Sequence, residues 1–170
     1  LHGCWRMPFV KSSLTIQAPG KLVLFGEYAV LEGETALVAS VNRFARCTAV
    51  PADTFTLTAL GFGRFTDSNL NTAPAILQTL FDSHPLPMAS IELDSRQLYV
   101  DEDPHGCKLG LGSSAAVSTA LLKTLIKLTG THQSLEQIFT KTQTAHRKAQ
   151  GLGSGIDVAA AVFGGVFEYQ

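Results

Sequence analysis

A short segment rich in glycine and serine, placed directly before a helical pattern, constrains this chain more than any other feature. The segment reads Gly110-Leu111-Gly112-Ser113-Ser114-Ala115-Ala116. Apolar residues then recur at helical spacing up to a glycine that suits a helix end, at Val117, Leu121, Leu125, Leu128 and Gly130. The N-terminus of a helix attracts anions through its free N–H groups and its dipole, and glycine lets the backbone approach them. One serine would suffice as a helix cap, so two glycines with two hydroxyls indicate a phosphate-binding loop.

Two other glycine-rich phosphate loops fit less well. A Walker A loop is excluded because no Gly-Lys-Ser/Thr follows at the required spacing. The segment does match G-x-G-x-x-A, the relaxed fingerprint of dinucleotide-binding domains, but that fingerprint should follow an apolar strand. Residues 101–108 are instead polar and turn-forming, and the expected acidic residue is missing because Glu136 falls inside a predicted helix. A dinucleotide-dependent dehydrogenase is therefore disfavoured.

The charge balance and the cysteines exclude several classes of protein. With 170 residues and a formal net charge of -1, the chain lacks the basic excess that nucleic-acid binding requires. Cys4, Cys47 and Cys107 are far apart and odd in number, so they predict neither a disulfide framework nor a zinc site. The sequence shows no signal-peptide pattern and no apolar run long enough for a membrane span. It predicts a cytoplasmic protein with free thiols and no nucleic-acid or membrane partner, and carries no signal of the oligomeric state.

The first half of the chain is predicted to be rich in β-strand. Strand-prone residues flank Ala18-Pro19-Gly20-Lys21, where proline and glycine predict a tight turn. A short helix is predicted over residues 73–81, ended by Asp82-Ser83-His84-Pro85. The predicted strands cover residues 14–17, 22–25, 36–41, 44–50, 55–60, 91–93 and 97–100.

The second half is predicted to be helical. After the helix that begins at Ser113, Ser134 and Gln137 form a capping box that opens a second helix, running to about Gln150. A glycine-rich turn over residues 151–155 leads into a short helix around residues 157–162, and a last strand is predicted over 166–169. Residues 1–13 are expected to be a disordered or non-native leader, and 14–170 one domain. Since the chain stops inside a predicted strand, more polypeptide is expected to follow it.

Three separated segments resemble the motifs of the N-terminal domain of GHMP kinases. They are Ala18-Pro19-Gly20-Lys21-Leu22-Val23-Leu24-Phe25-Gly26-Glu27-Tyr28-Ala29-Val30-Leu31, the loop from Gly110 to Ala116, and Gly153-Ser154-Gly155-Ile156-Asp157 continuing to Gly164-Gly165. The resemblance covers residues 14–169. It implies an α+β domain of the ribosomal protein S5 domain 2-like type, in which a mixed sheet packs against helices in two layers. It also implies that ATP binds with Mg²⁺, and that the C-terminal domain usual in these kinases is absent from this chain.

The resemblance implies roles for individual residues. Asp157 would be the catalytic carboxylate, while Lys21 would stabilise the transferring phosphoryl group and pair with Asp157. The loop residues from Gly110 to Ala115 would bind ATP, and Ser114 would also be a ligand of magnesium. Taken alone, Asp157 could instead be a helix cap and Lys21 a surface lysine in a turn.

Local details favour the phosphomevalonate kinase branch of the superfamily over the mevalonate kinases. Tyr28 after Gly26-Glu27, Lys108 before the loop, His146 after Ala145, and Gly153 before Ser154 all resemble that branch. Mevalonate kinases typically place His, Pro, Glu and Pro at the corresponding points. The residues with an implied part in substrate binding are Lys108, His146, Ser154, Glu27 and Tyr28.

Several of these implied roles have alternatives. Lys108 is expected at the phosphate of the acceptor, whereas Arg147 and Lys148 fit a solvated helix face equally well. His146 could bind the substrate, replace the missing magnesium-binding Glu through a water molecule, or simply lie on a helix face. The expected small-molecule acceptor is phosphomevalonate, with mevalonate second. A non-catalytic nucleotide-binding protein of the same fold is the alternative from another class.

Overall fold

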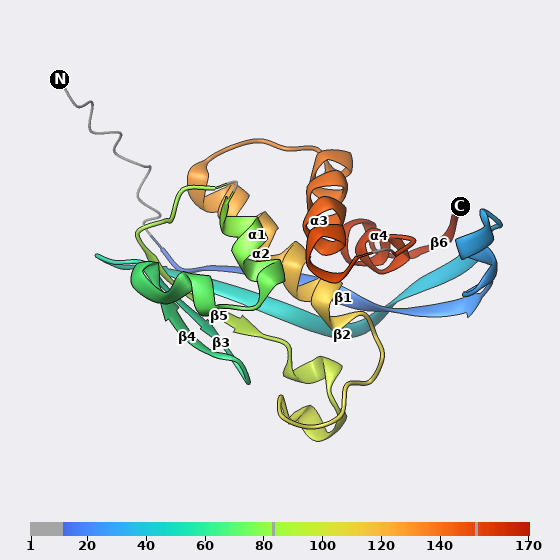
Figure 1. Ribbon diagram of the computed structural model, residues 1–170, viewed down its shortest axis with the longest axis horizontal. Coiled ribbons are helices and arrows are strands. Elements are labelled where there is room, and N and C mark those ends of the chain that lie inside the picture. Colours follow the sequence, from blue (N-terminus) through green and yellow to red (C-terminus); the bar gives the residue numbers. More distant parts are fainter. Residues whose placement is uncertain (1–11, 83, 152) are drawn as a thin grey trace.

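The computed structural model describes residues 12–82, 84–151 and 153–170, which form two layers, with the helices on one face of a sheet (Figure 1). Of the expected leader, residues 1–11 lie outside the described residues, while Ser12 and Ser13 are exposed ahead of the first strand. The strands are β1 (Leu14–Phe25), β2 (Ala36–Pro51), β3 (Thr56–Ala59), β4 (Gly63–Thr66), β5 (Ala89–Asp94) and β6 (Val166–Tyr169). The helices are α1 (Ala75–Asp82), α2 (Ser113–Thr129), α3 (Leu135–Gln150) and α4 (Ile156–Phe163).

The sheet is mixed, as expected for the α+β class. Its order is β1-β2-β5-β3-β4, with β6 paired to β2. Only β3 and β5 pair in parallel, and the other described pairs are antiparallel. Because β1 follows one edge of β2 along nearly its whole length, β6 and β5 share the other edge, against residues 36–39 and 46–51. The start of β2 therefore lies between the first strand and the final one.

The turn predicted at residues 18–21 is wrong, because β1 is one continuous strand. The register changes instead on the partner strand: Pro19 faces Phe44 while Gly20 faces Val41, so two residues of β2 have no opposite number. Proline has no N–H for the ladder, and a bulge accommodates that gap without breaking the strand. The side chain of Gln97 fills the bulge, since its Oε1 accepts a hydrogen bond from the N–H of Phe44 at 3.0 Å.

The strand predicted at residues 97–100 is also wrong. Two short 3-10 helices occupy this region, η3 (Arg96–Leu98) and η4 (Val100–Glu102), with left-handed backbone at Asp101 and Glu102. Leu98 and Tyr99 are buried here, so their apolar character serves the core rather than a strand. Strand β4, which was not predicted, is a four-residue partner of β3 that begins with glycine, a residue depleted in strands.

The helix predictions in the second half are confirmed. α2 ends at Gly130 in the left-handed conformation (φ 67°), and α3 begins at the capping box of Ser134 and Gln137, with both hydrogen bonds present. α2 lies at the centre of the molecule, where the fully buried Leu121, Leu122 and Leu125 pack in the main core. No helix among the described residues is long and apolar enough to cross a membrane.

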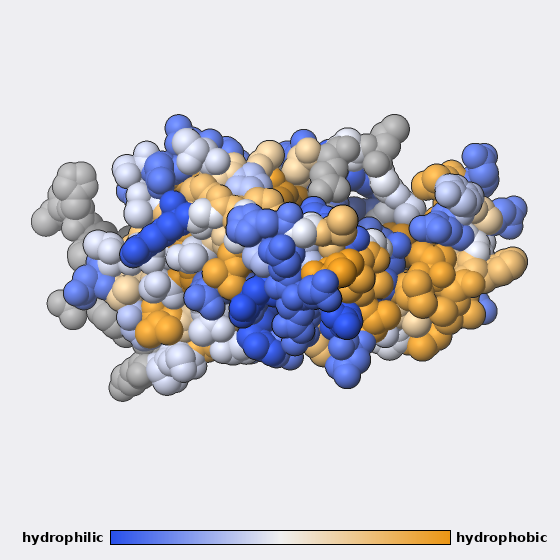
Figure 2. Space-filling view, turned by 90° about the horizontal axis from the view of Figure 1, so that it is seen from below, coloured by the Kyte–Doolittle hydropathy of each residue, from blue (hydrophilic) through white to orange (hydrophobic). Residues whose placement is uncertain are grey.

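The face of the sheet opposite the helices is partly apolar. Figure 2 shows polar atoms over the middle of this face and apolar atoms gathered toward one end. The exposed apolar side chains at that end of β1 and β6 include Leu22, Leu24, Phe25 and Val166. The main core therefore lies between the sheet and the helices. The candidate site lies on the same side of the sheet as the helices.

Candidate active site

The glycine loop ends as the N-terminus of the central helix. Gly110 and Gly112 have φ values of 74° and 73°, the left-handed region that favours glycine, and Gly112 is the N-cap of α2. Ser113 and Ser114 form the first turn, where N–H groups have no partner within the helix. The loop can therefore offer backbone donors and two hydroxyls to an anion at the positive end of a 17-residue helix.

The first motif is joined to this loop by backbone contacts. The N–H of Lys21 donates to the carbonyl of Leu111 at 2.9 Å. Beside it, a Cβ on Gly20 would come within 2.8 Å of that same carbonyl and 2.9 Å of a methyl group of Leu98. Only glycine lets β1 approach the loop so closely. The loop and β1 are consequently fixed relative to each other.

Lys21 and Asp157, the two predicted catalytic residues, form an ion pair. The Nζ of Lys21 lies 3.3 Å from Oδ1 of Asp157 and 4.0 Å from Oε1 of Glu27. The side chain of Lys21 is only 11% exposed, against 38% for Asp157. A Cβ on Gly112 would lie 3.4 Å from Cγ of both Lys21 and Asp157. The three motifs, far apart in sequence, thus meet at one point.

Asp157 reaches this point from the first turn of α4. The N-cap of α4 is Gly155 (φ 90°), so Asp157 is not the N-cap residue that the alternative interpretation required. Its carboxylate lies in the first turn, near the positive end of the helix dipole. Just before the helix, the hydroxyl of Ser154 accepts a hydrogen bond from the N–H of Ile156 at 3.4 Å. The carboxylate of Asp157 is thus not used to cap the helix and is free to act in the site.

His146, on α3, lies close to both the loop and Asp157. Burial lowers the pKa of its imidazole, an effect opposed by the negative charge of Asp157 and by a backbone hydrogen bond with Ser114. Its Nε2 is buried and has no hydrogen-bond partner among the described residues. A buried polar atom without a partner is uncommon and is often satisfied by a ligand or water. His146 is therefore placed to contact a bound molecule in its neutral form.

A cavity of about 400 Å³ collects most of the predicted substrate-binding residues. Its lining includes the predicted Lys21, Glu27, Tyr28, His146, Ser154 and Asp157. Sequence reasoning missed Gln143 of this lining and set Arg147 aside as a possible solvated helix face. On α3, His146 and Arg147 follow Gln143 by three and four residues, so both lie on the same helix face as Gln143. This spacing could have indicated Gln143 and Arg147 from the sequence. We call this the first cavity.

A second cavity of about 180 Å³ lies on the other side of the loop. Ser113, Ser114 and Lys108 contribute to it, so Lys108 is separated from the other predicted substrate-binding residues. The remaining wall is largely apolar and comes from β3, the β3–β4 turn, α1, β5 and α2: Ala59, Leu60, Phe62, Pro74, Ile76, Leu77, Leu93, Ser95, Tyr99 and Val117. The sequence carried no local signal for this wall, because its residues resemble ordinary core residues.

The residues present suit a magnesium ion that arrives with a nucleotide better than a preformed metal site. No group of three or more His, Cys, Asp or Glu side chains able to hold a metal occurs within the described part of the chain. Magnesium in phosphoryl-transfer sites commonly keeps its waters and takes few protein ligands besides substrate phosphates. The hydroxyl of Ser114, on the loop and beside His146, fits such a limited role.

Comparisons with known proteins agree with this arrangement. The family model described as "GHMP kinases N terminal domain" matches residues 71–165. The chain is 30% identical over 158 residues to the phosphomevalonate kinase of Saccharolobus solfataricus, covering 90% of this chain and 48% of that protein. It is 34% identical over 154 residues to the mevalonate kinase of Archaeoglobus fulgidus, covering 87% and 50%. The chain spans about half the length of these curated relatives.

Solved structures show the same fold. The Lin0012 protein from Listeria innocua superposes with a TM-score of 0.77 at 29% identity, covering 94% of this chain and 48% of that one. The mevalonate kinase of Methanococcus jannaschii superposes with a TM-score of 0.74 at 19% identity, covering 95% and 54%. With a family match over more than half of its residues, and with the loop, Lys21 and Asp157 converging as described, the chain belongs to the GHMP kinase family.

Proposed function

We propose that the protein transfers the γ-phosphoryl group of ATP to phosphomevalonate, giving ADP and diphosphomevalonate. One observation carries this proposal: the ion pair of Lys21 and Asp157 lies against Gly112, at the loop that separates the two cavities. A phosphate chain lying along the loop would have its terminal group beside that pair. Phosphoryl transfer depends mainly on positioning and charge stabilisation, which this arrangement can supply.

The second cavity is proposed to hold the nucleotide. Its apolar wall suits a base and sugar, while its polar side is formed by Ser113, Ser114 and Lys108. Since Lys108 shares this cavity with the loop hydroxyls, we assign its ammonium group to the phosphates of ATP. This assignment replaces the expectation that Lys108 binds the phosphate of the acceptor.

The first cavity is proposed to hold the acceptor. Arg147 has no ion pair among the described residues and lines this cavity, so it can bind an anionic group of the acceptor. The buried Nε2 of His146 offers a further hydrogen-bonding group, and Ser154 a hydroxyl. Glu27 and Tyr28 also line this cavity, and they are 63% exposed at the Glu27 side chain and 81% exposed at Tyr28.

In the proposed reaction, a phosphate oxygen of the acceptor attacks the γ-phosphorus, the bond to the β,γ-bridging oxygen breaks, and ADP leaves with that electron pair. A phosphate monoester is largely ionised near neutral pH, with a second pKa of about 6, so Asp157 would mainly orient the acceptor and Lys21. Lys21 would stabilise negative charge on the transferring group. Magnesium bound with the nucleotide would neutralise charge between the β- and γ-phosphates, and Ser114 is the residue proposed to hold it.

Mevalonate is the second candidate acceptor, and the identities favour it slightly. The mevalonate kinase of A. fulgidus is 34% identical to this chain, compared with 30% for the phosphomevalonate kinase of S. solfataricus. With a hydroxyl acceptor, Asp157 would accept the proton that the hydroxyl loses. A non-catalytic nucleotide-binding protein is the remaining alternative, and the retained pair of Lys21 and Asp157 argues against it.

The test measures ADP release by the full-length protein, because the curated relatives are about twice as long as this chain. Phosphomevalonate, mevalonate and no acceptor are compared at saturating ATP with magnesium. Release that depends on phosphomevalonate supports the proposal, and a preference for mevalonate assigns the second candidate acceptor. Nucleotide binding without release in either case contradicts both and favours the non-catalytic alternative. A cytoplasmic location is part of the proposal, and fractionation of cells checks it.

A further inference from the structure

The described residues of the loop that precedes Asp157 are mostly glycine: Gly151, Gly153, Ser154 and Gly155. Gly151 and Gly155 adopt left-handed φ values of 86° and 90°, and a Cβ on Gly151 or Gly153 would meet nothing within 4 Å. Such a glycine-rich backbone has many conformations open to it. Yet Gly151, Gly153, Ser154 and Gly155 all line the first cavity, and Asp157 follows directly. A contact from another element would therefore restrict the backbone in front of Asp157.

Two side chains from other elements supply that contact at one atom. The hydroxyl of Tyr169, on β6, donates to the carbonyl oxygen of Ser154 at 2.7 Å. Nε2 of Gln143, on α3, donates to the same oxygen at 3.4 Å. A carbonyl oxygen has two lone pairs and can accept both bonds, of which the shorter is the stronger. We call the side chains of Tyr169 and Gln143 the carbonyl clamp.

The carbonyl clamp also leaves no room for a side chain at the next residue, Gly155. A Cβ on Gly155 would collide with Nε2 of Gln143 and come within 2.9 Å of the hydroxyl of Tyr169. Glycine at this position is thus required both by its φ of 90° and by the clamp. The backbone between Ser154 and Asp157 has little freedom to move while the two side chains stay in place.

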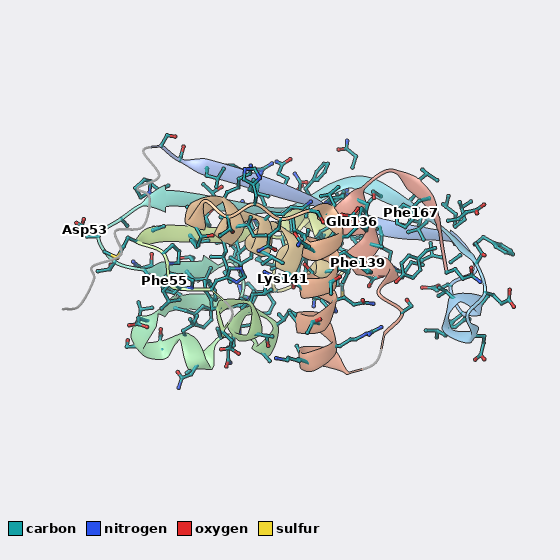
Figure 3. The ribbon with its side chains drawn as sticks, turned by 90° about the horizontal axis from the view of Figure 1, so that it is seen from above. Asp53, Phe55, Glu136, Phe139, Lys141 and Phe167 are labelled. Atoms are coloured by element: carbon teal, nitrogen blue, oxygen red, sulfur yellow. The ribbon has the colours of Figure 1, made fainter. Side chains whose placement is uncertain are left out.

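Both members of the clamp stand on regular elements, a strand and a helix. Tyr169 is paired with Ala36 on β2, so its position is set by the sheet. Figure 3 shows Phe139 of α3 and Phe167 of β6 near the same end of the molecule, where both line a cavity beside Tyr169. The rings of Phe139 and Phe163 pack with their centroids 5.8 Å apart. Burial raises the pKa of Tyr169, which keeps its hydroxyl protonated and able to donate.

We propose that Tyr169, assisted by Gln143, is a positioning residue that holds Ser154 and Asp157 in their reactive arrangement by clamping the carbonyl of Ser154. This inference rests on the proposed function, because it assigns Asp157 to the reaction. Neither member of the clamp lines the second cavity, so nucleotide binding should not depend on it. Tyr169 lines neither cavity, so it acts on the acceptor and on transfer through the loop, whereas Gln143 also lines the first cavity.

Tyr169→Phe removes one hydroxyl and tests the clamp in the full-length protein. We expect kcat/KM for the acceptor to fall roughly 10- to 100-fold, as a displacement of about 1 Å in a reactive group can cause. The dissociation constant of ATP should stay unchanged. Gln143→Met, which removes the longer hydrogen bond with similar volume, should have a smaller effect. Thr56→Val is the matched control, since it removes a hydroxyl that donates to Ser90 at 3.0 Å between β3 and β5.

Amide hydrogen exchange gives a second readout that needs no turnover. Deuterium uptake by peptides spanning residues 151–157 should be faster in Tyr169→Phe than in the wild type, and unchanged in Thr56→Val. If the wild type transfers phosphate to neither acceptor, the proposed function fails while this comparison still tests the clamp. Unchanged uptake over 151–157, or faster uptake with normal kcat/KM, overturns the inference. Faster uptake over the whole chain with a lowered melting temperature also overturns it, because the role would then be general stability.

Discussion

At the scale of single residues, removal of the carboxylate of Asp157 is expected to affect the rate of phosphoryl transfer most directly. Asp157→Asn keeps the side-chain shape but removes the negative charge 3.3 Å from Nζ of Lys21. We expect kcat to fall on the order of 10²–10⁴-fold, the usual contribution of a positioned acid–base group. The affinity for ATP should remain close to that of the wild type, because Asp157 lies on the acceptor side of the loop. Steady-state rates and calorimetric titration with ATP measure the two quantities.

Asp53→Asn is the control for that experiment. Asp53 is an exposed carboxylate after β2, at the end of the molecule away from Phe167 (Figure 3). Its substitution makes the same chemical change and should leave kcat unaltered. A wild-type rate in Asp157→Asn would remove Asp157 from the mechanism, and equal losses in both variants would indicate a non-specific effect.

His146 makes the stability of the fold depend on pH. Burial lowers its pKa below the ordinary value of about 6.5, so below that pH the unfolded chain binds a proton that the native state resists. Stability is therefore full above pH 6.5 and is lost as the pH falls toward the lowered native pKa. His146→Gln should flatten this part of the profile, by roughly 1.4 kcal/mol for each unit of pKa difference.

Melting temperatures at several pH values between 5.5 and 7.5 check this dependence. His132→Gln is the control, because His132 is exposed beyond the end of α2 and should leave the acid slope in place. If wild type and His146→Gln lose stability equally on acidification, the buried imidazole is not the responsible group.

At the scale of elements, the joint between β1 and the glycine loop is the most sensitive place. Gly20→Ala would place a Cβ within 2.8 Å of the carbonyl of Leu111, which is backbone and cannot move aside alone. Overpacking of this kind typically costs about 1–3 kcal/mol, and here it would also shift the loop. We expect a lower unfolding free energy in urea together with weaker ATP binding.

Gly106→Ala separates that steric effect from the general effect of adding a methyl group. Its Cβ would lie 3.2 Å from the nearest atom, the carbonyl of Asp103, in an exposed turn. This variant should lose less stability than Gly20→Ala and keep its affinity for ATP. Normal ATP binding by Gly20→Ala would show that the contact of β1 with Leu111 does not shape the loop.

The elements that the sequence predicted well are those whose signals are local. The capping box of Ser134 and Gln137 and the glycine stop at Gly130 act within a few residues, and all three behave as expected. The continuity of β1 depends on a bulge in β2 filled by Gln97, which is far away in sequence. The 3-10 turns at residues 97–100 could not be predicted either, because the conformation there depends on contacts with residues far away in sequence.

In the candidate site, too, the residues in sequence motifs were predictable, and those that depend on long-range packing were not. Lys21 and Asp157 were assigned by resemblance to a family, and the structure brings them within 3.3 Å of each other. The side of the loop on which Lys108 lies was not predictable, because it depends on how β3 and α1 form the second cavity. Tyr169 carried no signal at all: its role comes from the pairing of β6 with β2, which places its hydroxyl on Ser154.

At the scale of the whole molecule, the proposed function requires one phosphate chain to reach from the second cavity past Gly112 to the first cavity. A nucleotide that binds the native state adds stability, about 2.7 kcal/mol at 100 times its dissociation constant, and for a chain of this size each kcal/mol raises the melting temperature by roughly 2–4 °C. Gly112→Ala would insert a methyl group 3.4 Å from both Lys21 and Asp157, where the terminal phosphate is expected. We expect this variant to lose most of the ATP-dependent rise and of any further rise caused by the acceptor.

Gly33→Ala is the control that separates the effect of where the methyl group is added from the effect of backbone strain. Gly33 has a φ of 84°, close to the 73° of Gly112, so alanine is strained similarly at both positions. A Cβ on Gly33, however, would meet nothing within 4 Å. Both variants should therefore melt at comparably lower temperatures without ligand, while only Gly33→Ala keeps the full rise with ATP. Equal rises in the two variants would mean that the phosphate chain does not pass Gly112, and the division into a nucleotide cavity and an acceptor cavity would then be wrong.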